Sequence, residues 1–149
     1  MITIDCLTTK LGCLSIVTYD KWNQEYEGMV LRIVDSNQLI RSRLAKKTPK
    51  KSGYFAVFWE KNQEGRNRPF DDQNFPDFLA IVIVDGDQQG FFMIPHDVAV
   101  EKKLLTSSKG QGKMALRFYP PWCMNLNKTA LTTQKWQVDY FIDLTRKTN

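Results

Sequence analysis

A dense run of basic side chains is the first feature of the sequence that could do chemistry. Between residues 41 and 51 the chain carries six bases and no acid, namely Arg41, Arg43, Lys46, Lys47, Lys50 and Lys51. Like charges this close repel one another by about 1 kcal/mol per pair even in water. A chain keeps such a cluster either in a mobile solvated segment or where a polyanion neutralises it. The apolar stretch 54–59 follows at once, so we expect the run to be held between strands, with two arginines on the exposed face of the first strand.

A second group of bases lies in the last third of the chain. Residues 101–149 carry a net charge of +6, and their bases are mixed with aromatic residues. That mixture suits phosphate contact together with stacking on bases. The predicted nucleic-acid-binding residues are therefore the six bases above and Lys113, Arg117, Trp122 and Lys135. The competing interpretations are a solvated basic edge that discourages strand pairing, and a core position for the nearby Trp136 and Tyr140.

Acidic residues at expected strand ends raise a different chemistry. Pro76-Asp77 precedes an apolar stretch and resembles the opening of the PD-(D/E)xK nuclease motif. Such a site would hold Mg²⁺ on carboxylates, with Asp77 and Glu60 as ligands and with Glu27 and Lys61 completing it. The acid and lysine two residues apart that the motif requires on the next strand are missing. Turn-forming aspartates and solvated glutamates are favoured by roughly three to one, given how often short motifs occur by chance, and no catalytic or metal-binding residue is assigned.

Composition narrows the classes of protein further. A chain of 149 residues fits one domain, here residues 1–149, and no apolar run approaches a membrane span. The N-terminus lacks a secretory signal, so we expect a cytoplasmic protein. Three cysteines without a CxxC pair favour isolated thiols, and one histidine excludes a multi-histidine metal site. We expect no cofactor, and Mg²⁺ only if the nuclease alternative holds.

The order of expected elements predicts an α+β fold. Spacing and turn residues predict an opening helix that ends at Gly12, a hairpin over 29–45 and buried strands over 54–59 and 78–84. A polar loop over 60–76, a strand over 90–94, a helix from Pro95, a strand over 113–119 and a last helix over 127–144 follow. This pattern predicts a mixed, largely antiparallel central sheet of about five to six strands flanked by helices.

Several motifs follow one another along most of the chain, namely EYEG (25–28), RLAKKTPKKSGYFAVFWEK (from Arg43), NRPF (67–70), PDFL (76–79), GFFMIP (90–95), GKMALRFYPPW (112–122) and NKTALTTQKWQ (127–137). In their order and spacing they resemble the MepB family of small bacterial cytosolic proteins. The resemblance implies a restriction-endonuclease-like fold and a role in nucleic-acid binding. Carried over by position, it points to Arg43, Lys46, Thr48, Pro49, Lys50, Lys113, Arg117, Tyr119, Trp122, Gln134, Lys135 and Trp136.

These observations favour a cytoplasmic nucleic-acid-binding protein over an enzyme. DNA is favoured over RNA as its ligand, no membrane is involved, and the oligomeric state is left open. A Mg²⁺-dependent nuclease, complete or degenerate, is the first alternative. A regulatory module that binds an acidic protein is the second.

Overall fold

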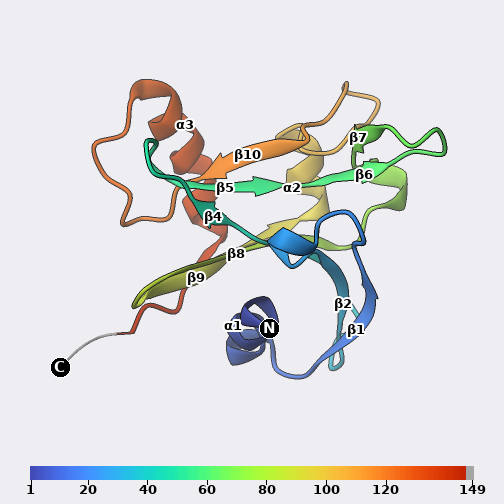
Figure 1. Ribbon diagram of the computed structural model, residues 1–149, viewed down its shortest axis with the longest axis horizontal. Coiled ribbons are helices and arrows are strands. Elements are labelled where there is room, and N and C mark those ends of the chain that lie inside the picture. The colour runs from blue at the N-terminus through green and yellow to red at the C-terminus, as the bar shows by residue number, and fades with distance from the viewer. Residues whose placement is uncertain (147–149) are drawn as a thin grey trace.

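A six-stranded sheet runs through the middle of the protein, whose computed structural model describes residues 1–146 (Figure 1). Its strands lie in the order β1 (Leu14–Tyr19), β2 (Met29–Ile33), β3 (Leu39–Leu44), β8 (Phe78–Asp85), β9 (Gln88–Pro95) and β11 (Phe141–Asp143). β3 and β8 pair in parallel, and the other four neighbouring pairs are antiparallel. The predicted α+β fold with a mixed, largely antiparallel central sheet is confirmed.

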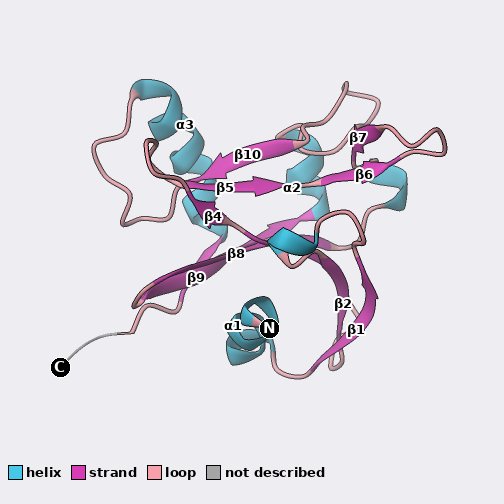
Figure 2. Ribbon diagram, viewed as in Figure 1, coloured by secondary structure: helices cyan, strands magenta, loops and turns pink. Residues whose placement is uncertain are grey.

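Two smaller sheets lie over one face of this central sheet, as the magenta arrows of Figure 2 show. The first orders β10 (Ala115–Phe118), β5 (Tyr54–Val57) and β4 (Lys46–Lys47), and the second is the hairpin of β6 (Trp59–Lys61) and β7 (Asn67–Pro69). Since β3 is followed by β4 after a single residue, the basic run crosses from the central sheet to the first small sheet.

Helices complete the layers on both faces. α1 (Ile2–Leu11) packs on the face opposite the small sheets, whereas α2 (His96–Glu101) and α3 (Lys128–Gln137) lie on the same side as them (Figure 1). Short 3₁₀ turns occupy Gln24–Tyr26, Asp72–Asn74 and Val138–Tyr140. No helix within residues 1–146 is both long and apolar enough to cross a membrane.

The position of β8, covered on both faces, explains why its sequence is a continuous apolar run. Ala80 and Val82 pack with Leu7 of α1, whereas Leu79 and Ile81 pack toward the small sheets. Successive side chains of a strand point to opposite faces, and here both faces are covered. The continuous apolar stretch predicted as a buried strand is therefore confirmed.

Local signals set three helix termini where the sequence predicted them, namely the end of α1 and the starts of α2 and α3. α1 ends before Gly12, whose φ of 77° is readily adopted by glycine. α2 follows Pro95 directly. The Asn127 side chain accepts a hydrogen bond from the Ala130 N–H and caps α3.

Three predicted elements are wrong in extent. The expected loop over 60–76 contains the β6–β7 hairpin, and β1 had not been predicted. The last helix ends at Gln137, and the chain then continues into β11, which pairs with β9. The stretch 54–59 divides into β5 and β6, and alternate β5 side chains are only half buried. Strand pairing overrode the local pattern, within one hairpin for β6 and β7 and with strands distant in the chain for β5 and β11.

Candidate nucleic-acid interface

The two arginines of β3 lie in a buried ion cluster and not on an exposed face. The Arg43 side chain is 0% exposed and that of Arg41 is 15% exposed. Both guanidinium groups donate to the carboxylate of Asp20, which is itself only 9% exposed. The prediction that these arginines face solvent is wrong, because the small sheets cover their side of β3.

Further contacts hold each arginine in place. Arg43 donates to the carbonyl oxygens of Val57, at 3.0 Å, and of its neighbour in the chain, at 2.8 Å. Arg41 lies 3.4 Å from a Glu60 oxygen, and its guanidinium carbon sits 3.9 Å from the centre of the Phe70 ring. These two arginines join the central sheet to the small sheets, so they are not free to contact a phosphate.

The charges in this cluster persist at neutral pH. Burial alone would raise the pKa of Asp20, but the hydrogen bond from Arg41 and the two guanidinium charges bring it below its usual value. Burial lowers the pKa of Arg43 to about 10, a change that the Asp20 charge opposes. The cluster is therefore a buried carboxylate shared by two cations, and it links the sheets.

Lys46 and Lys47 are exposed but paired. The Lys46 ammonium lies 2.9 Å from a Glu25 oxygen and 4.6 Å from the centre of the Tyr26 ring. The Lys47 ammonium lies 3.2 Å from an Asp85 oxygen. Exposed pairs of this kind contribute at most about 1 kcal/mol, so a polyanion can compete for either lysine at small cost.

Lys50, Lys51 and Arg117 line one groove of about 320 Å³. None of the nine residues that line it is acidic. Arg117 is held there by hydrogen bonds to the Thr48 hydroxyl at 2.8 Å and the Ser52 carbonyl at 3.3 Å. The groove thus gathers three positive charges, of which one is held in position before any ligand arrives.

The first turn of α3 forms another wall of this groove, through Asn127 and Ala130. The Asn127 cap satisfies the Ala130 N–H, and the N–H groups before it in a first helical turn have no partner within the helix. Helix N-termini favour anions because of these groups and the helix dipole. We call this groove, with Lys50, Lys51, Arg117 and the first turn of α3, the basic groove. The sequence predicted the bases of this groove and a helix that starts at Asn127. It did not predict that the start of this helix lies beside those bases.

Family and structural comparisons agree over nearly the whole chain. The pattern of the MepB-like family matches residues 20–143. This chain belongs to the MepB-like family. A solved structure described as the crystal structure of MepB is 40% identical, covers 98% of this chain and 97% of its own, and superposes with a TM-score of 0.86. No curated protein matches the sequence. The resemblance inferred from the motifs is confirmed.

Tyr119 of this MepB-like chain also lines the basic groove, whereas three other predicted contact residues lie outside it, namely Lys113, Trp122 and Lys135. Lys113 is exposed and lies two residues before the start of β10, and it does not line the groove. Lys135 is exposed in the last turn of α3, whereas the groove meets the first turn. Trp122 packs against the core, and its indole N–H donates to the Tyr54 hydroxyl at 2.9 Å. Trp122 is therefore not free to stack on a base.

The acids of the nuclease alternative are each engaged with different partners. Glu27 accepts from the Thr3 N–H at 3.0 Å, and Asp77 accepts from the Leu39 N–H at 2.8 Å. Glu60 forms ion pairs with Arg41 and with Arg68. Lys61 lies beside two tryptophans instead of an acid. Within residues 1–146, no group of three or more His, Cys, Asp or Glu side chains is placed to hold a metal ion.

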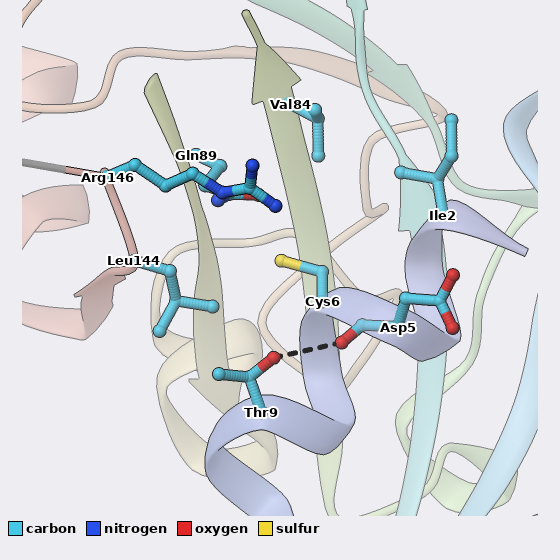
Figure 3. A pocket seen from close by; sticks show the side chains of 8 residues that line it. All are labelled: Ile2, Asp5, Cys6, Thr9, Val84, Gln89, Leu144 and Arg146. Carbon is cyan, nitrogen blue, oxygen red and sulfur yellow. Dashed lines mark hydrogen bonds between the residues drawn. The ribbon is translucent and has the colours of Figure 1, made fainter. Parts of the chain in front are cut away.

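A larger cavity, of about 440 Å³, lies between α1, the β8–β9 hairpin and the chain after β11 (Figure 3). Ile2, Val84 and Leu144 supply aliphatic walls. Burial raises the pKa of the Cys6 thiol there to about 11, so at neutral pH it is protonated and a poor nucleophile. This cavity offers less chemistry than the basic groove.

Proposed function

We propose that the protein binds nucleic acid, with DNA as the first ligand to test, by seating phosphates in the basic groove. The observation that carries this proposal is the collection of three bases and a helix N-terminus around a groove with no acid in its lining. Phosphate oxygens accept hydrogen bonds from arginine, from lysine and from backbone N–H groups at a helix start. The arrangement matches a polyanion better than it matches an apolar ligand.

The buried arginines reduce the number of phosphate contacts that we expect. Lys50, Lys51 and Arg117 give about three contacts, and log K should then fall with log salt at a slope of roughly −2.7 for a duplex or −2 for a single strand. Lys46 and Lys47 add to this only where the ligand displaces Glu25 and Asp85. A modest slope therefore supports the groove, whereas a slope near −5 requires further contacts.

We propose binding without cleavage, because the acids of the nuclease alternative are engaged in other contacts. A two-carboxylate Mg²⁺ site needs oxygens that are free and convergent. Glu60 is occupied by two arginines, and Asp77 accepts from the backbone of β3. The protein is thus proposed to hold nucleic acid through its backbone, largely without reading the sequence.

A matched pair of charge-reversal variants tests the proposal. Lys50→Glu with Lys51→Glu changes the groove, and Lys10→Glu with Lys109→Glu makes the same change of net charge at exposed positions outside it. Fluorescence anisotropy with labelled DNA and RNA, single- and double-stranded, would be titrated with salt for each variant. We expect the groove variant to lose at least tenfold in affinity and about two units of salt slope, and the control to lose far less.

Three results would contradict the proposal. Equal losses in the two variants would show that only net charge matters. No binding of any probe by the unaltered protein would reject nucleic acid as the ligand. The next measurement would then test whether the protein binds an acidic protein partner and whether heparin competes with that partner. Probe fragments that appear only with Mg²⁺ and vanish in Asp77→Ala would favour the nuclease alternative instead.

A further inference from the structure

A second group of aromatic and basic side chains lies apart from the basic groove. Trp22 is 56% exposed and Tyr19 is 52% exposed. They border a hollow of about 250 Å³ that Trp59, Lys21 and Lys61 also line. Large exposed aromatic side chains gathered at one place commonly mark a binding surface.

The two lysines of this group lie against its rings. The Lys21 ammonium is 5.0 Å from the centre of the Trp22 ring, and the Lys61 ammonium is 5.6 Å from the same ring. Lys61 also lies 5.4 Å from the centre of the Trp59 ring. An exposed cation–π contact contributes about 0.5–1 kcal/mol. A base stacked on an aromatic ring contributes about 1–3 kcal/mol. A base therefore displaces a lysine from the ring, and the freed ammonium can pair with the adjoining phosphate.

The acids beside this hollow are already neutralised. Asp20 is held by Arg41 and Arg43, and Glu60 by Arg41 and Arg68. Lys21 and Lys61 have no acidic partner within 4.0 Å in the part of the chain that the structure describes. The local field is therefore positive, which suits a phosphate next to a stacked base.

The turn that carries Trp22 is held firmly although its ring is exposed. The Asn23 side chain donates to the Trp59 carbonyl at 3.1 Å, and the Asp20 N–H donates to the Gly28 carbonyl at 2.8 Å. These hydrogen bonds hold in place the backbone from which the Trp22 side chain projects. A large ring that is held outward contributes little to the core, so its exposure suits recognition.

A strip of rings and cations connects this hollow with the basic groove. In β5 the odd-numbered residues are the less buried ones, whereas all three residues of β6 are half buried. Alternation of side chains along an extended chain places Phe55, Trp59 and Lys61 on one face. Arg117 of the groove lies over the Phe55 ring, with 5.8 Å from the guanidinium carbon to the ring centre. β5 and β6 follow one another across the molecule from α3 to the β6–β7 hairpin (Figure 1). From Phe55 to Lys61 the strip spans about 20 Å.

We propose that Trp22, with Tyr19 and the flanking lysines, is a stacking site for an unpaired nucleobase, which makes single-stranded nucleic acid the preferred ligand. This inference rests on the proposed function, because the same strand would reach the basic groove with its phosphates. In a duplex the bases are stacked on one another and present no free face to Trp22. The basic groove holds either form, and Trp22 discriminates between them.

The test compares oligo(dT) with a duplex of the same length, using anisotropy and the tryptophan fluorescence of the protein. We expect Trp22→Ala to weaken single-strand binding by roughly 5- to 150-fold, the range that loss of one stacked base produces, and to leave duplex binding within about twofold. Trp22→Phe keeps a ring and should restore most of the affinity. Val34→Ala removes a side chain of similar exposure, 50%, at another place, and serves as the control.

Each outcome separates this inference from the proposed function. Loss of single-strand binding in Trp22→Ala with rescue by Trp22→Phe supports the stacking site. Unchanged binding in Trp22→Ala, together with loss in the Lys50→Glu, Lys51→Glu variant, overturns the stacking site and leaves the groove. Equal weakening of single strand and duplex also overturns it, because Trp22 would not discriminate. Thermal unfolding of each variant confirms that the fold is retained.

Discussion

Replacing Asp20 with alanine should be far more damaging than its single charge suggests. The change leaves Arg43 with a charged side chain that has no exposure and no acidic partner. Removal of one partner of a buried ion pair costs about 3–5 kcal/mol, because the other charge is left uncompensated. A chain of this length has a total stability of about 5–15 kcal/mol. The melting temperature should fall by roughly 10 °C, at about 2–4 °C per kcal/mol.

Urea unfolding followed by circular dichroism measures this loss directly. Glu25→Ala is the matched control, since it removes an acid from the exposed Lys46, where both side chains are over 40% exposed. That control should change stability by no more than about 1 kcal/mol. The double variant Asp20→Ala with Arg43→Met should recover part of the lost stability, because it also removes the buried positive charge that has no partner. Equal stability of the two single variants would refute the buried cluster, as would a double variant less stable than Asp20→Ala.

Three further outcomes follow from single contacts. In Gly28→Ala the added Cβ would lie 2.9 Å from Arg43 Nη1. Overpacking of this kind costs about 1–3 kcal/mol, so the free energy of unfolding in the same urea assay should fall by that amount, and a neutral effect would contradict the packing. The hydrogen bond from the Tyr54 hydroxyl lowers the pKa of Asp85 below its usual value. The ionised Asp85 carboxylate therefore contributes its full stabilisation above the unfolded pKa of about 3.9, and this contribution is lost as the pH falls through the native pKa. Asp85→Asn should thus flatten the fall in stability below about pH 4. An unaltered pH profile would contradict this. Cys6, whose pKa burial raises to about 11, should react with a thiol reagent far more slowly than the exposed Cys13 until the chain unfolds, and equal rates in the native protein would contradict its burial.

Local sequence signals predicted those elements whose structure is set by their own residues. The opening helix and its end at Gly12, the continuous apolar strand β8 and the turn after Pro95 all follow from periodicity or from backbone restrictions. Motif order also predicted the family that the comparisons confirm. Such signals act over a few residues, so they survive in any tertiary context.

Strand pairing decided the elements that the sequence analysis missed, both within a hairpin and between distant segments. Residues 138–144 continue a helical pattern, yet Phe141 pairs with Phe92 and the helix ends at Gln137. β6 and β7 form within a polar stretch because each supplies the other's backbone hydrogen bonds. A local pattern cannot show which distant strand is available to pair.

The sequence by itself determined that positive charge gathers in two segments, 41–51 and the last third, and that the chain has an α+β pattern. Only the tertiary structure decided which of those charges is free. Arg41 and Arg43 lie only three to six residues before Lys46 and Lys47, but they point into the space between sheets, where Asp20 neutralises them. Lys50 and Lys51 meet Arg117 because β10 pairs with β5 across 60 residues of chain. The same charge therefore serves as an internal link at one position and lines the groove of the proposed function at another, because burial and pairing depend on the fold, whereas charge depends only on composition.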